Sequence, residues 1–324
     1  MSELLRKFIS PMRDWQSQAG LIVIPRVPLS DREFWRHLAG GYYRHLCPEV
    51  VIPRSTWAEL PGWQRDEVRI QAVGMSADKA VLVGRSAARV HGLPVPGRDE
   101  VVELNLPGKN LRPPRKQWAA GVRYWSGYLP AEQMTVVNGL RVTTIHRTLL
   151  DLARHQGMTD AIVACDAALS MPDVSREFVA GRLAALGPVP GIRKLRRVLE
   201  LADDRSESPL ESWARAQIIT ADLPELRSLE VQVPVLGGKF RIDQVLNGGI
   251  AIELHGDIKY DDVTTGTRAI DQMKSDRERE RKIQNEGYTM LHAGYPDLVT
   301  QRDGEPVFLG KVRAALRAWE QRAA

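Results

Sequence analysis

The segment 240–255, FRIDQVLNGGIAIELH, constrains the fold most, because two apolar runs flank a short Asn-Gly-Gly tract. Such a tract between alternating runs predicts a β-hairpin. A shift of one residue in the pairing would exchange the two faces of a strand. A two-residue loop would set Glu253 opposite Ile242, on the apolar face. We therefore predict a three-residue loop at 247–249, in which glycine supplies the left-handed conformation.

This register sets two carboxylates directly opposite each other, those of Asp243 and Glu253, with β-carbons about 4.5–5.5 Å apart. Like charges at this separation destabilise a sheet, so a proton, a basic side chain or a divalent cation must offset them. An oxygen-rich site suits Mg²⁺, which supports phosphodiester hydrolysis. The alternative is pairing with Arg241 and nearby lysines at a solvated edge. The expected apolar face holds Phe240, Ile242, Leu246, Ile250, Ile252 and Leu254, and the other face holds Arg241, Asp243, Glu253 and His255.

Glu211 is a further candidate acid, at the start of a helix predicted at 208–220. The segment Ser208-Pro209-Leu210-Glu211 fits a capping box, with a serine cap and a glutamate three residues later. The capping role is sufficient locally, and a role as a third carboxylate at the metal stays open beside it.

Basic residues gather before position 205. Of the 45 Lys and Arg and 40 Asp and Glu, the first 204 residues hold 28 and 21, a net +7. Such patches suit a polyanion, most often nucleic acid, although a solvated surface explains them equally well. The candidate DNA-binding residues are Lys109, Arg112, Arg115, Lys116, Arg193, Lys194, Arg196 and Arg197.

The pattern of elements predicts an α/β (α+β) protein in three parts. They are a small helical and strand module of degenerate winged-helix type at 1–75, a basic α+β domain at 76–203, and a domain with a mixed sheet flanked by helices at 204–324. No apolar run approaches the roughly 20 residues of a membrane span, and the two cysteines form no framework. We therefore expect a cytoplasmic protein with no membrane partner.

Several individual elements are also expected. An Asn-Gly turn predicts a hairpin at 134–143. The remaining expectations are helices at 31–46, 144–154, 160–170, 176–186, 192–202, 268–286 and 306–322, and strands at 50–53, 101–106, 229–236 and 288–293.

Residues 205–300 resemble the very-short-patch-repair-like endonuclease domains of the restriction-endonuclease-like PD-(D/E)xK superfamily. The order of SPLES, EVQVP, FRIDQV, AIELHGDIKY, DRERE and a Gly-Tyr-led strand carries the resemblance. It implies that Glu211, Asp243 and Glu253 bind Mg²⁺, or Mn²⁺ as a substitute. Asp276, Arg277, Arg279 and Glu280 also fit the charged helix of this family. From the residues alone, this helix either lines the active-site cleft, with Arg277 and Arg279 facing phosphates, or presents a solvated face with ion pairs.

His255 departs from this pattern, since the family tends to have aspartate there and the superfamily often has lysine. Histidine can bind a metal or carry protons, so His255 stays a catalytic candidate. Lys259 is the preferred stand-in for the lysine and could stabilise developing charge.

The front part has a second resemblance, to AbiEi-like antitoxin and transcriptional-regulator proteins of type IV toxin–antitoxin systems. It rests on SAARVHGLP at 86–94 and on RTLLDLAR at 147–154. His91 and His146 lie in these segments and are expected to pack or hydrogen-bond rather than to bind a ligand. The resemblance implies binding to DNA and a partner gene product.

Together these patterns predict a DNA-binding protein with a Mg²⁺-dependent endonuclease domain, acting in DNA repair, phage defence or a toxin–antitoxin-like system. Duplex cleavage would favour a homodimer. The alternative is a non-catalytic DNA-binding regulator or antitoxin whose nuclease domain is a relic, which His255 and the basic front part favour.

Overall fold

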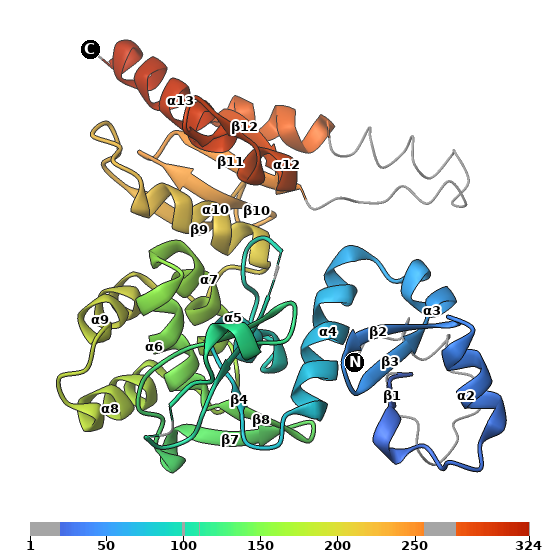
Figure 1. Cartoon of the computed structure of the whole chain (residues 1–324). Coiled ribbons are helices and arrows are strands. Elements are labelled where there is room, and N and C mark those ends of the chain that lie inside the picture. The colour runs from blue at the N-terminus through green and yellow to red at the C-terminus, as the bar shows by residue number, and fades with distance from the viewer. Residues whose placement is uncertain (1–19, 99–100, 110, 256–276, 324) are drawn as a thin grey trace. The chain divides into compact units, whose positions relative to one another are not determined.

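The computed structural model describes residues 20–98, 101–109, 111–255 and 277–323, and Figure 1 shows the whole chain. The helices and mixed sheets confirm the predicted α+β class. The chain divides into two compact units, residues 1–155 and 156–324. This division falls after His155, whereas the sequence predicts boundaries after residues 75 and 203. The three-part organisation stays a prediction.

The first unit contains two sheets. One has the order β1-β3-β2 and is antiparallel, and the other has the mixed order β6-β5-β4-β8-β7. The strands are β1 (Ile22–Val23), β2 (Tyr43–Cys47), β3 (Val50–Pro53), β4 (Val81–Leu82), β5 (Val102–Asn105), β6 (Val122–Tyr124), β7 (Met134–Val137) and β8 (Leu140–Thr143).

Helices alternate with these strands. They are α2 (Arg32–Ala39), α3 (Arg54–Glu59), α4 (Gly62–Ser76), α5 (Gly84–Val90) and α6 (Ile145–His155), with 3-10 turns η1 (Ile24–Arg26), η2 (Arg115–Gln117) and η3 (Ala131–Gln133). The predicted helix at 31–46 is wrong in its second half. Asp31 caps α2 by accepting from the Phe34 amide at 3.0 Å, but the helix ends at Ala39. Two glycines follow, Gly41 has φ +73°, and the next residues pair with β3.

The turn between β7 and β8 confirms the predicted hairpin. Asn138 and Gly139 have φ values of +50° and +77°, the left-handed pair that a two-residue hairpin turn needs.

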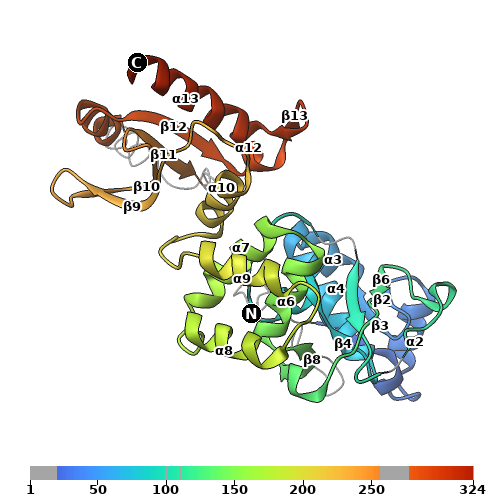
Figure 2. The same cartoon turned by 90° about the vertical axis from the view of Figure 1, so that its left-hand side faces the viewer.

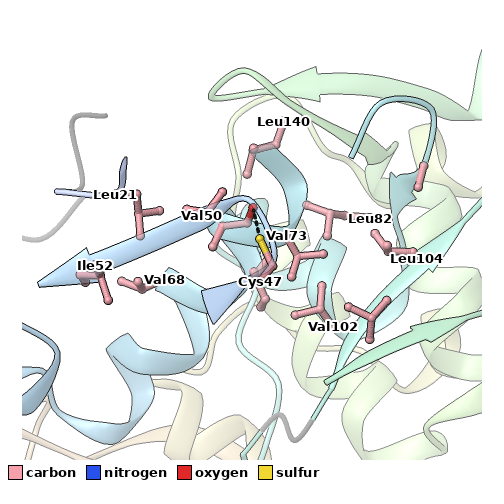
Figure 3. Packing of buried hydrophobic residues seen from close by; sticks show 14 of the residues in the cluster. Leu21, Cys47, Val50, Ile52, Val68, Val73, Leu82, Val102, Leu104 and Leu140 are labelled. Carbon is pink, nitrogen blue, oxygen red and sulfur yellow. Dashed lines mark hydrogen bonds between the residues drawn. The ribbon is translucent and has the colours of Figure 1, made fainter. Parts of the chain in front are cut away.

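One apolar cluster joins the two sheets of the first unit through α4 (Figure 3). Val68 and Val73 of α4 pack among side chains of β3, β4, β5 and β8, including Ile52, Leu82 and Leu104, which are at most 2% exposed. The Cys47 thiol donates to the Ala72 carbonyl at 3.6 Å. This cysteine therefore has a packing role, consistent with the absence of a disulfide framework.

The second unit begins with helices α7 (Met158–Leu169), α8 (Arg176–Leu186) and α9 (Ile192–Leu201), followed by α10 (Pro209–Thr220). A buried ion pair ties α7 to α10. Arg215 donates to both Asp166 oxygens, at 2.7 and 2.9 Å, and Ser212 and the Asp203 amide also donate to this carboxylate. The predicted boundary at 203/204 therefore separates α10 from Asp166, the carboxylate with which Arg215 of α10 pairs.

The rest of this unit is a four-stranded mixed sheet of order β12-β11-β10-β9, with α10 and α13 against it (Figure 2). Only β11 and β12 run parallel. This confirms the predicted mixed sheet flanked by helices. Its elements are β9 (Leu229–Val235), β10 (Phe240–Leu246), β11 (Ile250–His255), a helix at 277–285, β12 (Thr289–Gly294), α12 (Tyr295–Val299), the paired β13 (Gln301–Arg302) and β14 (Glu305–Pro306), and α13 (Val307–Ala323).

Both faces of this sheet are buried, so the predicted division into one apolar and one polar face is wrong. Leu246 and Ile252 pack with α10 and α13, as expected. On the other face Val245 and Ala251 pack with Ile283 of the helix at 277–285, and this second cluster also takes in Ile242. A sheet covered by helices on both sides carries apolar residues on both. The first part of the predicted helix at 268–286 lies outside the described residues.

Candidate functional site

The hairpin β10–β11 has the predicted register and loop. Leu246 pairs with Ile250 and Gln244 with Ile252, and continuing this register by one residue places Asp243 opposite Glu253. Residues 247–249 form the loop, in which Asn247 and Gly248 have φ values of +49° and +70°. The register prediction is confirmed, because a different loop length would have exchanged the faces.

The two opposed acids lie in a desolvated environment. Glu253 is 7% exposed, and burial, followed by the charge of Asp243, raises its pKa to about 7. Burial also raises the pKa of Asp243, with a smaller contribution from the charge of Glu211. The Leu254 amide donates to Asp243 at 2.8 Å and acts in the opposite direction. Burial and the opposed charges therefore favour either a protonated Glu253 near neutral pH or a cation beside the two acids.

Arg279, from the helix at 277–285, is the cation that meets this pair. Its guanidinium donates to Glu253 at 2.8 Å and to the Arg241 carbonyl at 3.0 Å. The expected alternative, pairing with Arg241, is wrong in detail, because Arg241 pairs with Glu207. Glu253 is buried in this pair and Arg279 is 35% exposed, since the helix partly covers this face of the sheet.

Glu211 forms the predicted cap. The Ser208 hydroxyl accepts from the Glu211 amide at 3.2 Å, and the carboxylate of Glu211 accepts from the Ser208 hydroxyl, the Glu207 amide and Gln232. The same carboxylate contributes to the raised pKa values of Asp243 and Glu253. Glu211 thus completes the cap at Ser208 and also lies close enough to Asp243 and Glu253 for its charge to raise their pKa values.

Three side chains near the acids were missed by sequence reasoning. Gln232 has φ +53° and reaches Glu211, and Gln244 donates to the Glu211 carbonyl at 2.8 Å. His292 lies beside Glu253 in the parallel pair β11–β12. Nothing in the local pattern marks them, because their contacts depend on strand order.

His255 contacts a histidine of the neighbouring strand β12. Its ring stacks on that of His292, with an Nε2–Nδ1 distance of 2.9 Å, and His292 contacts Glu280 at 3.2 Å. Lys259 and Asp276 lie outside the described residues. Within the described ranges, no group of three or more His, Cys, Asp or Glu side chains is arranged to hold a metal ion.

The basic candidates lie on three separate elements. Those in and before η2 and those on α9 are exposed, and one of them, Arg197, pairs with Glu200 at 2.9 Å. Arg277 is exposed as well. Arg279 binds Glu253, so the charge expected to face phosphates is partly committed within the fold. The exposed candidates are Lys109, Arg112, Arg115, Lys116, Arg193, Lys194, Arg196, Arg197 and Arg277.

The segment RTLLDLAR forms α6 and carries a buried ion pair. Arg147 donates to Asp151 at 3.0 Å and to Gln133 at 2.5 Å. Burial raises the pKa of Asp151 to about 6, and Arg147 opposes this shift. These residues fasten α6 to the turn before β7.

The segment SAARVHGLP also has a structural role. The Ser86 hydroxyl accepts from the Glu103 amide at 2.9 Å. His91 lies 2.6 Å from the Thr143 carbonyl, and burial lowers its pKa. His146 lies 3.2 Å from the Thr144 hydroxyl. The expectation that both histidines pack and hydrogen-bond agrees with these contacts.

Both of these segments fall within one family match. Residues 79–201 match the AbiEi antitoxin C-terminal domain. The predicted resemblance of the front part is therefore confirmed for this AbiEi-like region. No curated protein matches the chain. The resemblance of residues 205–300 to very-short-patch-repair-like endonucleases stays a prediction.

The AbiEi-like region ends at Leu201, the last residue of α9. It therefore includes the sheet of β4 to β8, helices α5 to α9, and all of the basic candidates that precede α10. No helix in the described part of the chain is long and apolar enough to cross a membrane.

Proposed function

We propose that the protein is a non-catalytic, DNA-binding regulator of the antitoxin type, in which the sheet β9 to β12 is a nuclease-like scaffold. The observation that carries this proposal is the AbiEi-like region at 79–201. The exposed arginines Arg112 and Arg115 and the basic face of α9 lie in that region. A partner gene product, the toxin that an antitoxin restrains, belongs to the same proposal, as does cytoplasmic action.

The state of the carboxylate pair also favours regulation over catalysis. Arg279 donates to Oε1 of Glu253 at 2.8 Å and so occupies one of the two oxygens with which this carboxylate could bind a metal. His255 stands on β11 where the endonuclease resemblance expects aspartate, and it contacts His292. A nuclease scaffold whose acids are offset by a side chain keeps its fold without needing a metal ion.

Duplex binding tests the main proposal. Fluorescence anisotropy would follow a labelled duplex from upstream of this gene between 50 and 200 mM salt. We expect the logarithm of the association constant to fall with the logarithm of salt concentration, because phosphate contacts release counterions. Replacing one phosphate-contacting arginine, as in Arg115→Ala, should reduce the slope by about 1. Arg141→Ala, an exposed arginine on β8, is the matched control. No binding at 50 mM salt would refute the proposal.

A Mg²⁺-dependent endonuclease is the second candidate. The observation that favours it is the pKa of Glu253, raised to about 7 by burial and by the opposed Asp243, because a bound cation would relieve that repulsion. The donor set fits in part: Asp243 and Glu253, with Glu211 nearby, would hold Mg²⁺ or Mn²⁺ once Arg279 moved. The ion would polarise a phosphoryl oxygen and activate water.

Cleavage separates the two candidates. Supercoiled plasmid and single-stranded DNA would be incubated with wild type and Asp243→Ala, in Mg²⁺, Mn²⁺ or EDTA. Metal-dependent nicking that disappears in Asp243→Ala would establish the nuclease and refute the non-catalytic reading. Duplex binding without cleavage by either protein would support the regulator.

A further inference from the structure

A cavity of about 710 Å³ lies within the first unit, at the edge strand of the five-stranded sheet. Its walls come from the carboxyl end of β6, from the segment around η2, and from the last residues of α6. The volume falls in the range of about 300–1,000 Å³ that small-molecule sites occupy. The DNA-binding proposal uses Arg112 and Arg115 of its lining but gives no role to the hollow itself or to its aromatic rings.

Three aromatic rings line the cavity, and their neighbours hold them in place. Trp118 donates its indole N–H to the Pro113 carbonyl at 2.8 Å, and its ring centroid lies 5.9 Å from that of Tyr124. Trp125 lies 4.1 Å from the ring of His155. The three aromatic side chains are half-buried, so part of each remains accessible. Fixed rings of this kind offer flat surfaces without a large ordering cost on binding.

Four arginines surround these rings: Arg112, Arg115, Arg123 and Arg154. All four are exposed, and none forms an ion pair with a carboxylate in the described part of the chain. Buried arginines elsewhere, such as Arg147, do have carboxylate partners. The C-terminal end of α6 contributes a partial negative charge, which Arg154 offsets. Arg112 lies over the Trp118 ring, with its guanidinium carbon 5.8 Å from the ring centroid. The cavity therefore concentrates positive charge that no carboxylate offsets in the described part of the chain.

We propose that this cavity binds a nucleoside phosphate, with the base against the aromatic rings and the phosphate paired with the arginines. Bases stack on aromatic side chains whatever their sequence, and guanidinium groups bind phosphate through paired hydrogen bonds. A simple anion would not stack on the rings, and an apolar ligand would not pair with the arginines. The nucleoside phosphate is either a free nucleotide or an unpaired nucleotide of a DNA strand. This inference goes beyond duplex binding, which needs phosphate contacts but no accessible base.

Calorimetric titration of the full chain tests the proposal. The probes are 2′-deoxyadenosine 5′-monophosphate, inorganic phosphate and deoxyadenosine. We expect the nucleotide to bind at least about tenfold more tightly than either fragment, because only the nucleotide engages both rings and arginines. Equal affinity for the nucleotide and inorganic phosphate would overturn the proposal, as would no binding of the nucleotide. A single-stranded tetranucleotide that outcompetes the mononucleotide would identify the strand as the source; the reverse order would identify the free nucleotide.

Two variants locate the binding. Trp118→Ala should weaken nucleotide binding by about fivefold to a hundredfold, since a stacked base contributes about 1–3 kcal/mol. Trp118→Phe should restore most of it. Arg123→Ala, at an exposed position, gives an independent test if Trp118→Ala fails to fold. Arg141→Ala lies outside the cavity and should bind as wild type does. Unchanged affinity in Arg123→Ala and in a folded Trp118→Ala would refute the assignment.

The outcome also separates this inference from the proposed function. Duplex binding without preference for the nucleotide over phosphate would overturn the inference and leave the regulator standing. Nucleotide binding without duplex binding would support the inference and refute the regulator.

Discussion

Disrupting the buried ion pair between Asp166 and Arg215 tests most directly which contacts stabilise the second unit. Asp166 is 3% exposed and Arg215 is 4% exposed. The guanidinium donates twice to the carboxylate and once to the Leu201 carbonyl, at 2.7 Å. The pair thus connects α7, the end of α9 and α10. Removing one partner leaves the other charge buried without compensation.

The expected magnitude follows from this burial. Breaking a buried pair costs about 3–5 kcal/mol, whereas replacing both partners with apolar residues is often neutral or stabilising. Asp166→Leu should therefore lower the unfolding free energy by about 3–5 kcal/mol. For a unit of this size each kcal/mol corresponds to about 2–4 °C, so the thermal midpoint should fall by about 6–20 °C.

Urea unfolding of the full chain, followed by circular dichroism, measures the effect. The double variant Asp166→Leu/Arg215→Met should recover most of the loss, which a double-mutant cycle reports as a coupling energy. Arg197→Met is the matched control, because it breaks an exposed pair with Glu200 that is worth about 0–1 kcal/mol. If Asp166→Leu costs no more than Arg197→Met, the reasoning fails.

Three further predictions concern other sites. The pKa of Glu253 is raised to about 7, so its contribution to stability is full below pH 4.5 and is lost as the pH rises through 7. Glu253→Gln should therefore unfold at higher urea than wild type at pH 8 and differ little at pH 5; parallel pH profiles would contradict this. Gly84 has φ +54°, and an added β-carbon would lie 2.7 Å from Trp125, so Gly84→Ala should cost more than about 1–3 kcal/mol in urea unfolding. Gly181→Ala, in open space on α8, should be neutral or stabilising, and equal midpoints for the two variants would refute the argument. Arg147→Ala leaves its buried carboxylate partner on α6 unpaired and should cost about 3–5 kcal/mol by thermal unfolding; a loss below about 1 kcal/mol would disprove that role.

Local chemistry was enough to predict the elements that depend on near neighbours. The Asn-Gly turn at Asn138, the cap at Ser208 and the register of β10 with β11 all follow from residues within a few positions of each other. In each case a turn conformation or the alternation of a strand leaves one acceptable arrangement. The helix at 31–46 failed for a related reason, since the glycines that end α2 outweigh the helical spacing beyond them.

Contacts between distant segments were decided only by the tertiary structure. Arg279 reaches Glu253 from 26 positions away, because the helix at 277–285 packs on the second buried face of the sheet. Asp166 pairs with Arg215 although the sequence predicts a domain boundary between them, at 203/204. The cavity at β6 likewise combines Arg154 with Trp118, from separate elements.

The sequence by itself therefore determined the two hairpins at 134–143 and 240–255, the cap at Ser208 and the register that sets Asp243 opposite Glu253, because these depend on local conformation and on the period of two along a strand. The tertiary structure decided which cation offsets the two acids, which face of the sheet is covered and where unpaired arginines meet aromatic rings. Those outcomes depend on how helices pack over a sheet, and packing brings together side chains whose spacing along the chain carries no signal.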